Sequence, residues 1–317
     1  MPADRVEPRL PVAVVTGFLG AGKTTLVNHI LAAPTGLRVA VMVNEIGEIA
    51  IDGELIAAAE GMVELANGCI CCSINQDLVA AIGRLLTRRP LPDYLVVETT
   101  GLADPLPVAL TLARPEFRDE LRLDSIIAVA DAEHFALDLD AVTAGWRQLR
   151  YADFVVLNKC DRVCAERADA IEAKIGAVAA GIRVVRAAYA RVALPLLLAT
   201  DRYREHKPAP DNHDHLDEDG FETVSFASER PFSAERFQAF LETLPASVFR
   251  AKGVLDIAGV DGRHLFHLVG RRFTLDPAPG RHRGTNRLVL IGRRLDAAGL
   301  RARLAACLVP PLNPEPE

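Results

Sequence analysis

Lysine is scarce in this chain of 317 residues, which has five lysines against 31 arginines. Aromatic residues are few as well, at 5% of the sequence with a single tryptophan. The short basic clusters at 271–272, 281–283 and 293–294 are dispersed and carry no interleaved aromatic residues, and the net charge is −6. A nucleic-acid-binding protein is expected to show a basic stripe. We therefore expect no nucleic-acid partner and interpret these clusters as solvated surface.

The sequence also lacks an apolar run of membrane-spanning length, although half of its residues are hydrophobic. Residues 1–11 are charged, contain proline and show no apolar core of a secretory signal. We expect a cytoplasmic protein without a membrane partner. Its length suffices for one large domain or two ordinary ones.

Apolar runs rich in β-branched residues alternate with helical patterns up to about residue 200. We predict strands at 12–16, 38–44, 62–65, 94–98, 125–130, 154–158 and 182–186. We predict helices at 23–33, 76–88, 105–112, 141–151 and 166–177. Strands buried on both sides and joined by helical crossovers predict an α/β fold, with a mostly parallel sheet and helices on both faces.

The pattern changes in the C-terminal third, where we predict a smaller α+β domain. Its strands are expected at 222–226, 248–258, 264–269, 272–275 and 287–291, and its helices at 233–244 and 296–307. The predicted domains are 1–200 and 221–308, separated by a polar linker at 201–220 and followed by a flexible tail at 309–317. His213 and His215 in the linker belong either to a disordered acidic segment or to a loose metal site.

Residues 17–24 form a complete G-x-x-x-x-G-K-T phosphate loop between a predicted strand and a predicted helix. Glycines let backbone N–H groups close around phosphate oxygens at a helix N-terminus. Lys23 is expected to reach the β- and γ-phosphates, and the Thr24 hydroxyl to bind Mg²⁺. The predicted nucleotide-binding residues here are Gly17, Gly20, Ala21, Gly22, Lys23, Thr24 and Thr25. The alternative is a tight turn without a ligand.

Asn158, Lys159 and Asp161 form an Asn-Lys-x-Asp tetrad that follows a predicted strand. A carboxylate can accept two hydrogen bonds from the N1–H and N2–H₂ groups of guanine, whereas adenine presents a different edge. The tetrad therefore predicts GTP as the nucleotide. The alternative is an exposed loop in which Asp161 caps the next helix.

Glu98 ends a predicted strand and is followed three residues later by Gly101. This pattern matches the switch that senses the γ-phosphate, with the Gly101 amide on the phosphate and Glu98 on Mg²⁺ directly or through water. The alternative is a plain strand-to-helix turn. No glutamine stands where small signalling GTPases orient water, so slow turnover is expected.

The segment 44–53 occupies the place of the first switch. Its carboxylates Glu45, Glu48 and Asp52 are candidate ligands of Mg²⁺ or of a second metal, or else a solvated acidic loop.

Cys69, Cys71 and Cys72 place three of the six cysteines within four residues. Disulfides are disfavoured in a cytoplasm, and clustered thiols there favour metal or redox chemistry. Three thiolates suit Zn²⁺ or Co²⁺ in tetrahedral geometry and leave one position open, as a transferable ion requires. The alternative is packing as small hydrophobic residues, which is our interpretation of the isolated Cys160, Cys164 and Cys307.

Together these motifs resemble the CobW family of metal-handling GTPases, relatives of the urease and hydrogenase nickel-insertion GTPases. The likeness covers 17–24, 44–52, 69–72, 98–104, 158–161 and, in the second domain, 250–253 and 265–270. It implies a P-loop NTPase fold and a cytoplasmic GTPase that binds a transition metal through Cys-x-Cys-Cys and delivers it to a client enzyme. Two other functions stay open: a P-loop kinase of a small acceptor, and a non-enzymatic GTP-binding metal sensor or store. The client, the physiological metal and the oligomeric state are not predicted.

Overall fold

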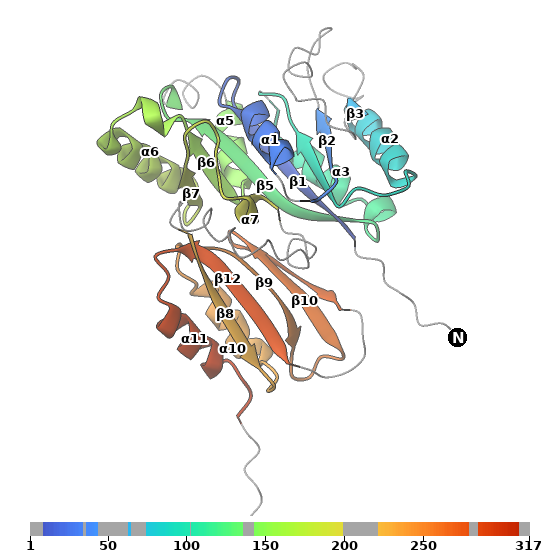
Figure 1. The fold of residues 1–317 in the computed structure, drawn as a ribbon, viewed down its shortest axis with the longest axis vertical. Coiled ribbons are helices and arrows are strands. Elements are labelled where there is room, and N and C mark those ends of the chain that lie inside the picture. Colours follow the sequence, from blue (N-terminus) through green and yellow to red (C-terminus); the bar gives the residue numbers. More distant parts are fainter. Residues whose placement is uncertain are drawn as a thin grey trace, which may run out of the picture. The chain divides into compact units, whose positions relative to one another are not determined.

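The computed structural model describes residues 9–33, 36–43, 63–64, 74–101, 103–135, 143–198, 221–278 and 285–310. The chain forms two compact units, one around each of two sheets (Figure 1). The predicted first switch at 44–53, the cysteine segment at 69–72 and the linker at 201–220 lie outside the described residues. Among those described, no helix combines the length and the hydropathy needed to cross a bilayer.

The larger unit holds a parallel sheet whose central strand precedes the phosphate loop. Its strands are β1 (Leu10–Gly17), β2 (Val39–Val43), β3 (Val63–Glu64), β4 (Tyr94–Glu98), β5 (Leu121–Asp131), β6 (Phe154–Asn158) and β7 (Arg183–Arg186). They are ordered β3-β2-β4-β1-β5-β6-β7, and all neighbours run parallel. The carboxyl ends of the strands therefore meet at one edge, where ligands bind in such sheets.

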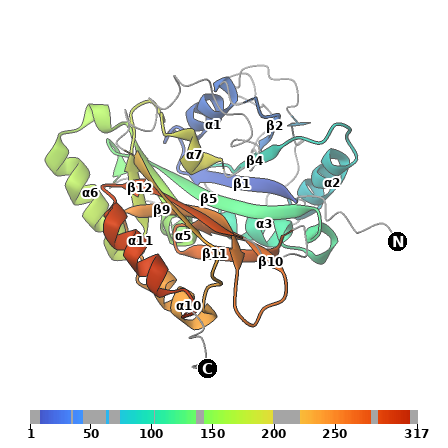
Figure 2. The same cartoon turned by 60° about the horizontal axis from the view of Figure 1, so that its bottom comes forward.

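Helices cover both faces of this sheet, with α1 and α7 on one face and α3 and α5 on the other (Figures 1 and 2). The helices are α1 (Lys23–Ala32), α2 (Ile74–Leu86), α3 (Pro105–Leu112), α5 (Thr143–Tyr151), α6 (Ala165–Val178) and α7 (Leu194–Leu197), with 3₁₀ turns η1 (Pro115–Phe117) and η2 (Cys160–Arg162). Two apolar clusters join them to the strands, one through α2 and α3 and the other through α5 and α6. The predicted α/β P-loop fold is confirmed.

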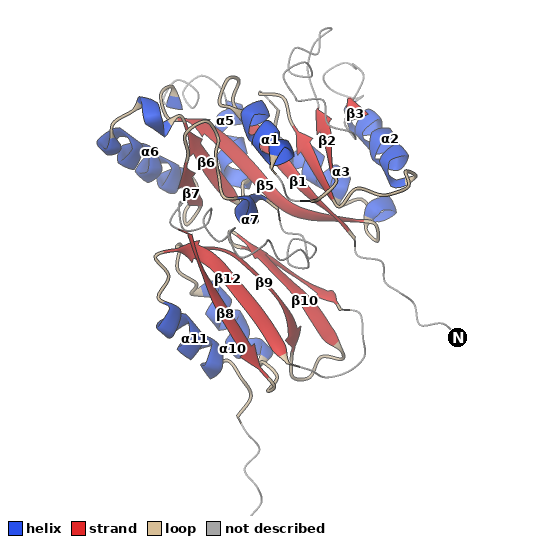
Figure 3. Cartoon of the chain, in the orientation of Figure 1, coloured by secondary structure: helices blue, strands red, loops and turns tan. Residues whose placement is uncertain are grey.

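The smaller unit is an antiparallel sheet with its helices on one face (Figure 3). Its elements are β8 (Phe221–Ser228), α10 (Ala234–Glu242), β9 (Val248–Asp256), β10 (Arg263–Val269), β11 (Arg272–Pro277), β12 (Asn286–Arg293) and α11 (Ala297–Ala306). The strand order is β11-β10-β9-β12-β8. Phe237 and Phe240 of α10 and Leu304 of α11 are buried in its core. The α+β prediction for this part of the chain is confirmed.

The sequence pattern underestimated β5, which begins at Leu121 rather than at residue 125. Arg122 and Asp124 interrupt the apolar run, but they pair with each other at 3.3 Å. The Tyr94 hydroxyl also donates to Asp124 at 2.5 Å. Buried polar groups are tolerated when they are hydrogen-bonded, so the strand continues through them. The limits predicted for the linker and for the tail at 309–317 stay predictions.

Candidate nucleotide-binding site

The phosphate loop joins the carboxyl end of β1 to α1, which begins at Lys23. Gly17 has a φ of 142° and Gly22 a φ of 105°, a region that L side chains rarely adopt. A Cβ atom at Gly17 would lie 2.2 Å from the carbonyl oxygen of Val129 on β5. The glycines of the motif are therefore required by the backbone, and the open N–H groups of the first turn of α1 lie at this loop.

The side chain of Lys23 is held in place by the backbone of the phosphate loop. Its side chain is buried, with 7% exposed, and its Nζ donates to the carbonyl oxygen of Phe18 at 3.1 Å. The positive charge thus lies against the backbone of the loop rather than in bulk solvent. A compact ammonium suits this position better than the planar guanidinium that the chain uses almost everywhere else.

Thr24 and Glu98 are brought into direct contact by the pairing of two strands. Val15 of β1 is opposite Glu98 of β4, which places the end of β4 beside the loop. The Thr24 hydroxyl donates to Glu98 Oε1 at 3.0 Å, and Glu98 is only 2% exposed. A buried carboxylate needs a partner or a cation, and hydroxyl and carboxylate oxygens are ligands that Mg²⁺ accepts. The pair therefore fits the predicted Mg²⁺, with a glutamate long enough to reach Thr24.

Gly101 packs directly on the phosphate loop. A Cβ atom there would lie 2.7 Å from the backbone nitrogen of Leu19 and 2.9 Å from its Cα. Residues of any other type would push the turn away from the loop. Asp104 then caps α3 by accepting from the Leu106 N–H at 2.9 Å. The segment is thus a strand-to-helix turn in which Gly101 packs against the phosphate loop, and the phosphate-sensing role of Gly101 stays a prediction.

Asn158 clamps three segments together. Its Nδ2 donates to the Ala21 carbonyl oxygen at 2.9 Å, and its Oδ1 accepts from the Ala190 N–H at 2.7 Å. The side chain is buried, and a Cβ at Gly22 would lie 2.3 Å from Asn158 Nδ2. The guanine motif is therefore attached to the phosphate loop by Asn158, whose amide fills the space left by a glycine.

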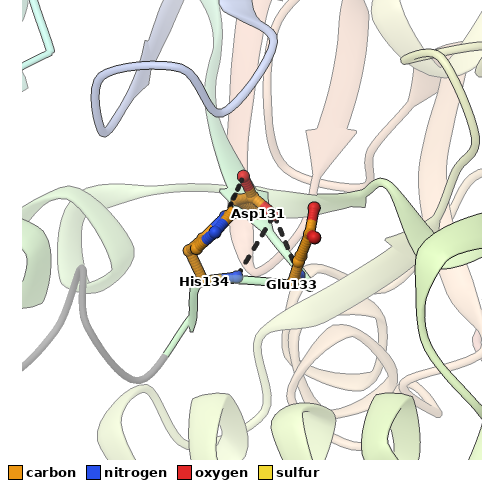
Figure 4. A group of neighbouring side chains, drawn as sticks. All are labelled: Asp131, Glu133 and His134. Atoms are coloured by element: carbon orange, nitrogen blue, oxygen red, sulfur yellow. Dashed lines mark hydrogen bonds and ion pairs between the residues drawn. The ribbon is translucent and has the colours of Figure 1, made fainter.

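Lys159 is held by Asp131, a residue for which the sequence analysis made no prediction. Lys159 has a φ of 60°, and its Nζ lies 2.6 Å from Asp131 Oδ2. The Oδ1 atom of Asp131 accepts from the N–H of Glu133 at 2.9 Å and of His134 at 3.3 Å (Figure 4). Asp131 pairs with Asn158 across β5 and β6, so its carboxylate lies beside the motif.

The side chains of Asp131, Glu133 and His134 offer ligand atoms close enough for one metal ion (Figure 4). The ammonium of Lys159 already provides the cation at Asp131, and His134 Nδ1 lies 3.2 Å from the same oxygen. Burial alone would raise the pKa of Asp131, but the bonds from Lys159, His134 and the Glu133 N–H outweigh it and hold that pKa below the usual value. We interpret this group as the support of Lys159 and not as a metal site.

Asp161 lies in η2 and is exposed, so its carboxylate is accessible to the base of a nucleotide. The residue that precedes α6 is Cys164, which excludes Asp161 as the cap of that helix. Cys160 is half-buried and burial raises the pKa of its thiol. Cys307 is buried as expected, but Cys164 is exposed, so our interpretation of Cys164 as a packing residue was wrong.

The loop after β7 is hydrogen-bonded to the Asn-Lys-x-Asp segment through its backbone. The Ala187 N–H donates to the Leu157 carbonyl at 2.8 Å, and the Cys160 N–H donates to the Ala187 carbonyl at 3.1 Å. Tyr189 and Ala190 both have φ values in the left-handed region, at 53° and 54°. Sequence inspection missed this loop because main-chain groups make these contacts, and no side-chain signature marks them.

Four predicted metal ligands, Cys69, Cys71, Cys72 and Glu45, lie outside the described residues. Their roles stay predictions. Asp131 had a signal that was not used, since an acid at the end of a predicted strand is the same feature that drew attention to Glu98.

A glycine loop, a hydroxyl bonded to a buried carboxylate and an Asn-Lys-x-Asp motif at the carboxyl edge of a parallel sheet define a P-loop nucleotide-binding protein of the GTPase class. The family model described as "CobW/HypB/UreG, nucleotide-binding domain" matches residues 11–186. A second model, "Cobalamin synthesis protein cobW C-terminal domain", matches residues 221–308. The chain therefore belongs to the CobW/HypB/UreG family of P-loop GTPases.

Curated relatives match almost the whole chain. A Pseudomonas aeruginosa protein named "Zinc chaperone CobW" is 35% identical, over 95% of this chain and 92% of its own length. An Escherichia coli protein named "Zinc chaperone YjiA" is 32% identical, over 93% of this chain and 98% of its own length. The solved structure of Zn(II)-bound YjiA GTPase from E. coli aligns with 95% of this chain and 100% of that chain, at 25% identity and a TM-score of 0.46.

Proposed function

We propose that this protein is a GTP-hydrolysing metallochaperone that binds Zn²⁺ or Co²⁺ and delivers it to a client metalloprotein in a nucleotide-dependent way. The observation that carries the nucleotide half is the contact between Thr24 and the buried Glu98, beside a guanine motif that Asn158 attaches to the phosphate loop. The metal half is supported by the three clustered cysteines and by relatives named zinc chaperones.

Each residue of the nucleotide site has a distinct task in this proposal. Asp161 accepts the two guanine donors, while Asp131 holds Lys159 so that its stem lies along the base. Lys23 neutralises charge on the β- and γ-phosphates, and the Gly101 amide donates to the γ-phosphate. Thr24 and Glu98 would hold Mg²⁺, which neutralises phosphate charge when it is bound.

Glu98 also orients water in this scheme, since it is buried and bonded to Thr24 beside the phosphate loop. The expected turnover is slow, because the segment after Gly101 has no glutamine where small signalling GTPases have the glutamine that orients the attacking water. Slow hydrolysis suits a protein that must find a client before it resets.

The metal site that we propose consists of the thiolates of Cys69, Cys71 and Cys72. Three thiolates select Zn²⁺ or Co²⁺ and leave one coordination position open to a client. The segment falls in sequence between the two predicted switches, and Glu45 of the first switch is proposed to contribute a carboxylate to Mg²⁺ or to the transferable ion. Metal and nucleotide occupancy would then be coupled through the switches.

Two assays on the full chain test this function. Equilibrium titration with labelled GTP and ATP should show a strong preference for GTP, and Asp161→Asn should weaken GTP binding by roughly tens to hundreds of fold because a charge-assisted pair is lost. Asp119→Asn removes the same charge from an exposed position at the opposite edge of the sheet and serves as the control. Equal affinity for GTP and ATP in the wild type would contradict the guanine assignment.

Multiple-turnover phosphate release, with and without Zn²⁺, separates the proposal from its rivals. The proposed enzyme releases phosphate to water repeatedly without an added acceptor. A protein that turns over only with a small-molecule acceptor would be a kinase. A protein that binds GTP and Zn²⁺ but never turns over would be a sensor or store.

A further inference from the structure

Gln148 of α5 binds two carbonyl groups of the turn that follows β4. Its Nε2 donates to the carbonyl oxygen of Gly101 at 3.2 Å and to that of Ala103 at 3.1 Å. An amide NH₂ group has two hydrogens, so both bonds can exist together. Gln148 is 3% exposed, and it reaches this turn from a helix more than 40 residues away in sequence.

A second contact joins the same two segments at the surface. Arg147 donates to Asp104 at 3.2 Å, but the two side chains are 59% and 21% exposed. Exposed pairs contribute little, whereas buried carbonyls left without a donor carry a substantial penalty. Among the side chains of α5 that the structure describes, Gln148 therefore makes the main contact with the turn, and Arg147 is secondary.

Gly101 is fixed from two sides by these contacts. Its Cα lies so close to Leu19 of the phosphate loop that a Cβ atom would meet the Leu19 nitrogen at 2.7 Å. Its carbonyl oxygen is bound by Gln148. A glycine without such restraints samples far more backbone conformations than any other residue. The bond to Gln148 therefore restricts the backbone rotation of Gly101, a residue that packs against the phosphate loop.

We propose that Gln148 is a positioning residue for GTP hydrolysis, which orients the Gly101 turn so that its amide meets the γ-phosphate. The proposal rests on the phosphate-sensing role of Gly101 stated above. Preorganised donors in a buried site act without reorganisation during the reaction. Helix α5 thereby becomes part of the element that distinguishes GTP from GDP, although it contains none of the recognised nucleotide motifs.

The test is Gln148→Met, which keeps the length of the side chain and removes both donors. We expect binding of a non-hydrolysable GTP analogue to weaken by about tenfold, with a similar loss of kcat, because the turn must be reordered without its partner. GDP affinity should stay within about twofold, because GDP lacks the γ-phosphate that the turn senses. Gln238→Met makes the same change on the exposed face of α10 and should alter nothing.

Gln148→Asn is the second variant, because a side chain shorter by one methylene still carries the donor pair. It should lie between wild type and Gln148→Met in both measurements, and it serves as the decisive variant if Gln148→Met fails to fold. The inference is overturned if a folded variant without these bonds keeps the wild-type ratio of GTP-analogue to GDP affinity, or if GDP binding falls equally. A wild-type protein that shows no GTP turnover would overturn the proposed function itself. If the wild type turns over GTP and a folded Gln148 variant keeps the wild-type affinities, only the inference about Gln148 is overturned.

Discussion

Replacing Asp131 by asparagine tests how the guanine motif is held in place. In the wild type, Lys159 Nζ lies 2.6 Å from Asp131 Oδ2, and Oδ1 accepts the N–H groups of Glu133 and His134. Asparagine keeps an acceptor for these backbone groups, but it removes the negative charge and turns an NH₂ group toward the lysine. Lys159 then loses the partner that fixes its side chain, while the turn after β5 is preserved.

The size of the effect follows from burial. A hydrogen bond to a charged group contributes about 1.5–3 kcal/mol. The side chain of Asp131 is 5% exposed and that of Lys159 is 23% exposed, so partial screening moves the value toward the lower limit. We expect GTP and GDP affinities to fall together by about tenfold, since the base is common to both nucleotides. This equal loss contrasts with the GTP-selective loss expected for Gln148→Met.

The assay is titration of labelled GTP and GDP against wild type and Asp131→Asn, with circular dichroism to verify folding. Glu133→Gln is the matched control, because it removes a neighbouring charge whose pair with Arg162 is exposed, at 40% and 55%. Its affinities should stay within about twofold of wild type. A folded Asp131→Asn protein with unchanged GDP affinity would refute the idea that Asp131 supports base recognition.

Three further outcomes are expected. Glu98→Gln should keep nucleotide binding, measured by titration, and lose turnover, measured by phosphate release, whereas Lys23→Ala should lose binding. Normal turnover in Glu98→Gln would show that Glu98 has a structural role only. Gly22→Ala should destabilise the fold by roughly 1–3 kcal/mol in denaturant titration, because its Cβ would meet the Asn158 amide at 2.3 Å and its φ is 105°; wild-type stability would contradict this clamp. Because the pKa of Asp131 is lowered in the folded protein, its ionisation should stabilise the fold above the ordinary carboxyl pKa of 3.8, and this contribution should be lost as the pH falls below 3.8. Thermal unfolding of wild type and Asp131→Asn from about pH 6 to 3 should therefore show the stability difference between them shrinking. A difference that stays constant with pH would contradict this link between the pKa and stability.

The local pattern of the sequence predicted a large part of the fold. β4, β6 and α3 begin and end at the predicted residues, because their apolar runs are bounded by clear signals such as Asp104 before Pro105. Thr24 and Glu98 were assigned to one site from motif spacing, and strand pairing brings them into contact. Such features are local or are fixed by the order of parallel strands, so a single sequence carries them.

The residues that support the site are harder to predict, although the position of Asp131 at the end of a predicted strand marks it as a candidate. Gln148 and Asp131 act on residues 47 and 28 positions away, and neither belongs to a local motif. The loop at Ala187–Ala190 works through main-chain groups, which leave no signature in side-chain identity. Interactions of this kind arise only after the sheet has assembled, and they decide how rigidly the recognised residues are held.

The coupling of metal to nucleotide is the central claim, and Co²⁺ affinity in three nucleotide states tests it most directly. The intensity of the thiolate charge-transfer band gives the affinity in nucleotide-free, GDP-bound and GTP-analogue-bound full-length protein. We predict that the GTP analogue tightens Co²⁺ binding by about 5–150-fold, and that Cys71→Ser abolishes both the band and the coupling while GTP still binds. Identical Co²⁺ affinities in all three states would contradict nucleotide-dependent delivery and leave two independent sites on one chain.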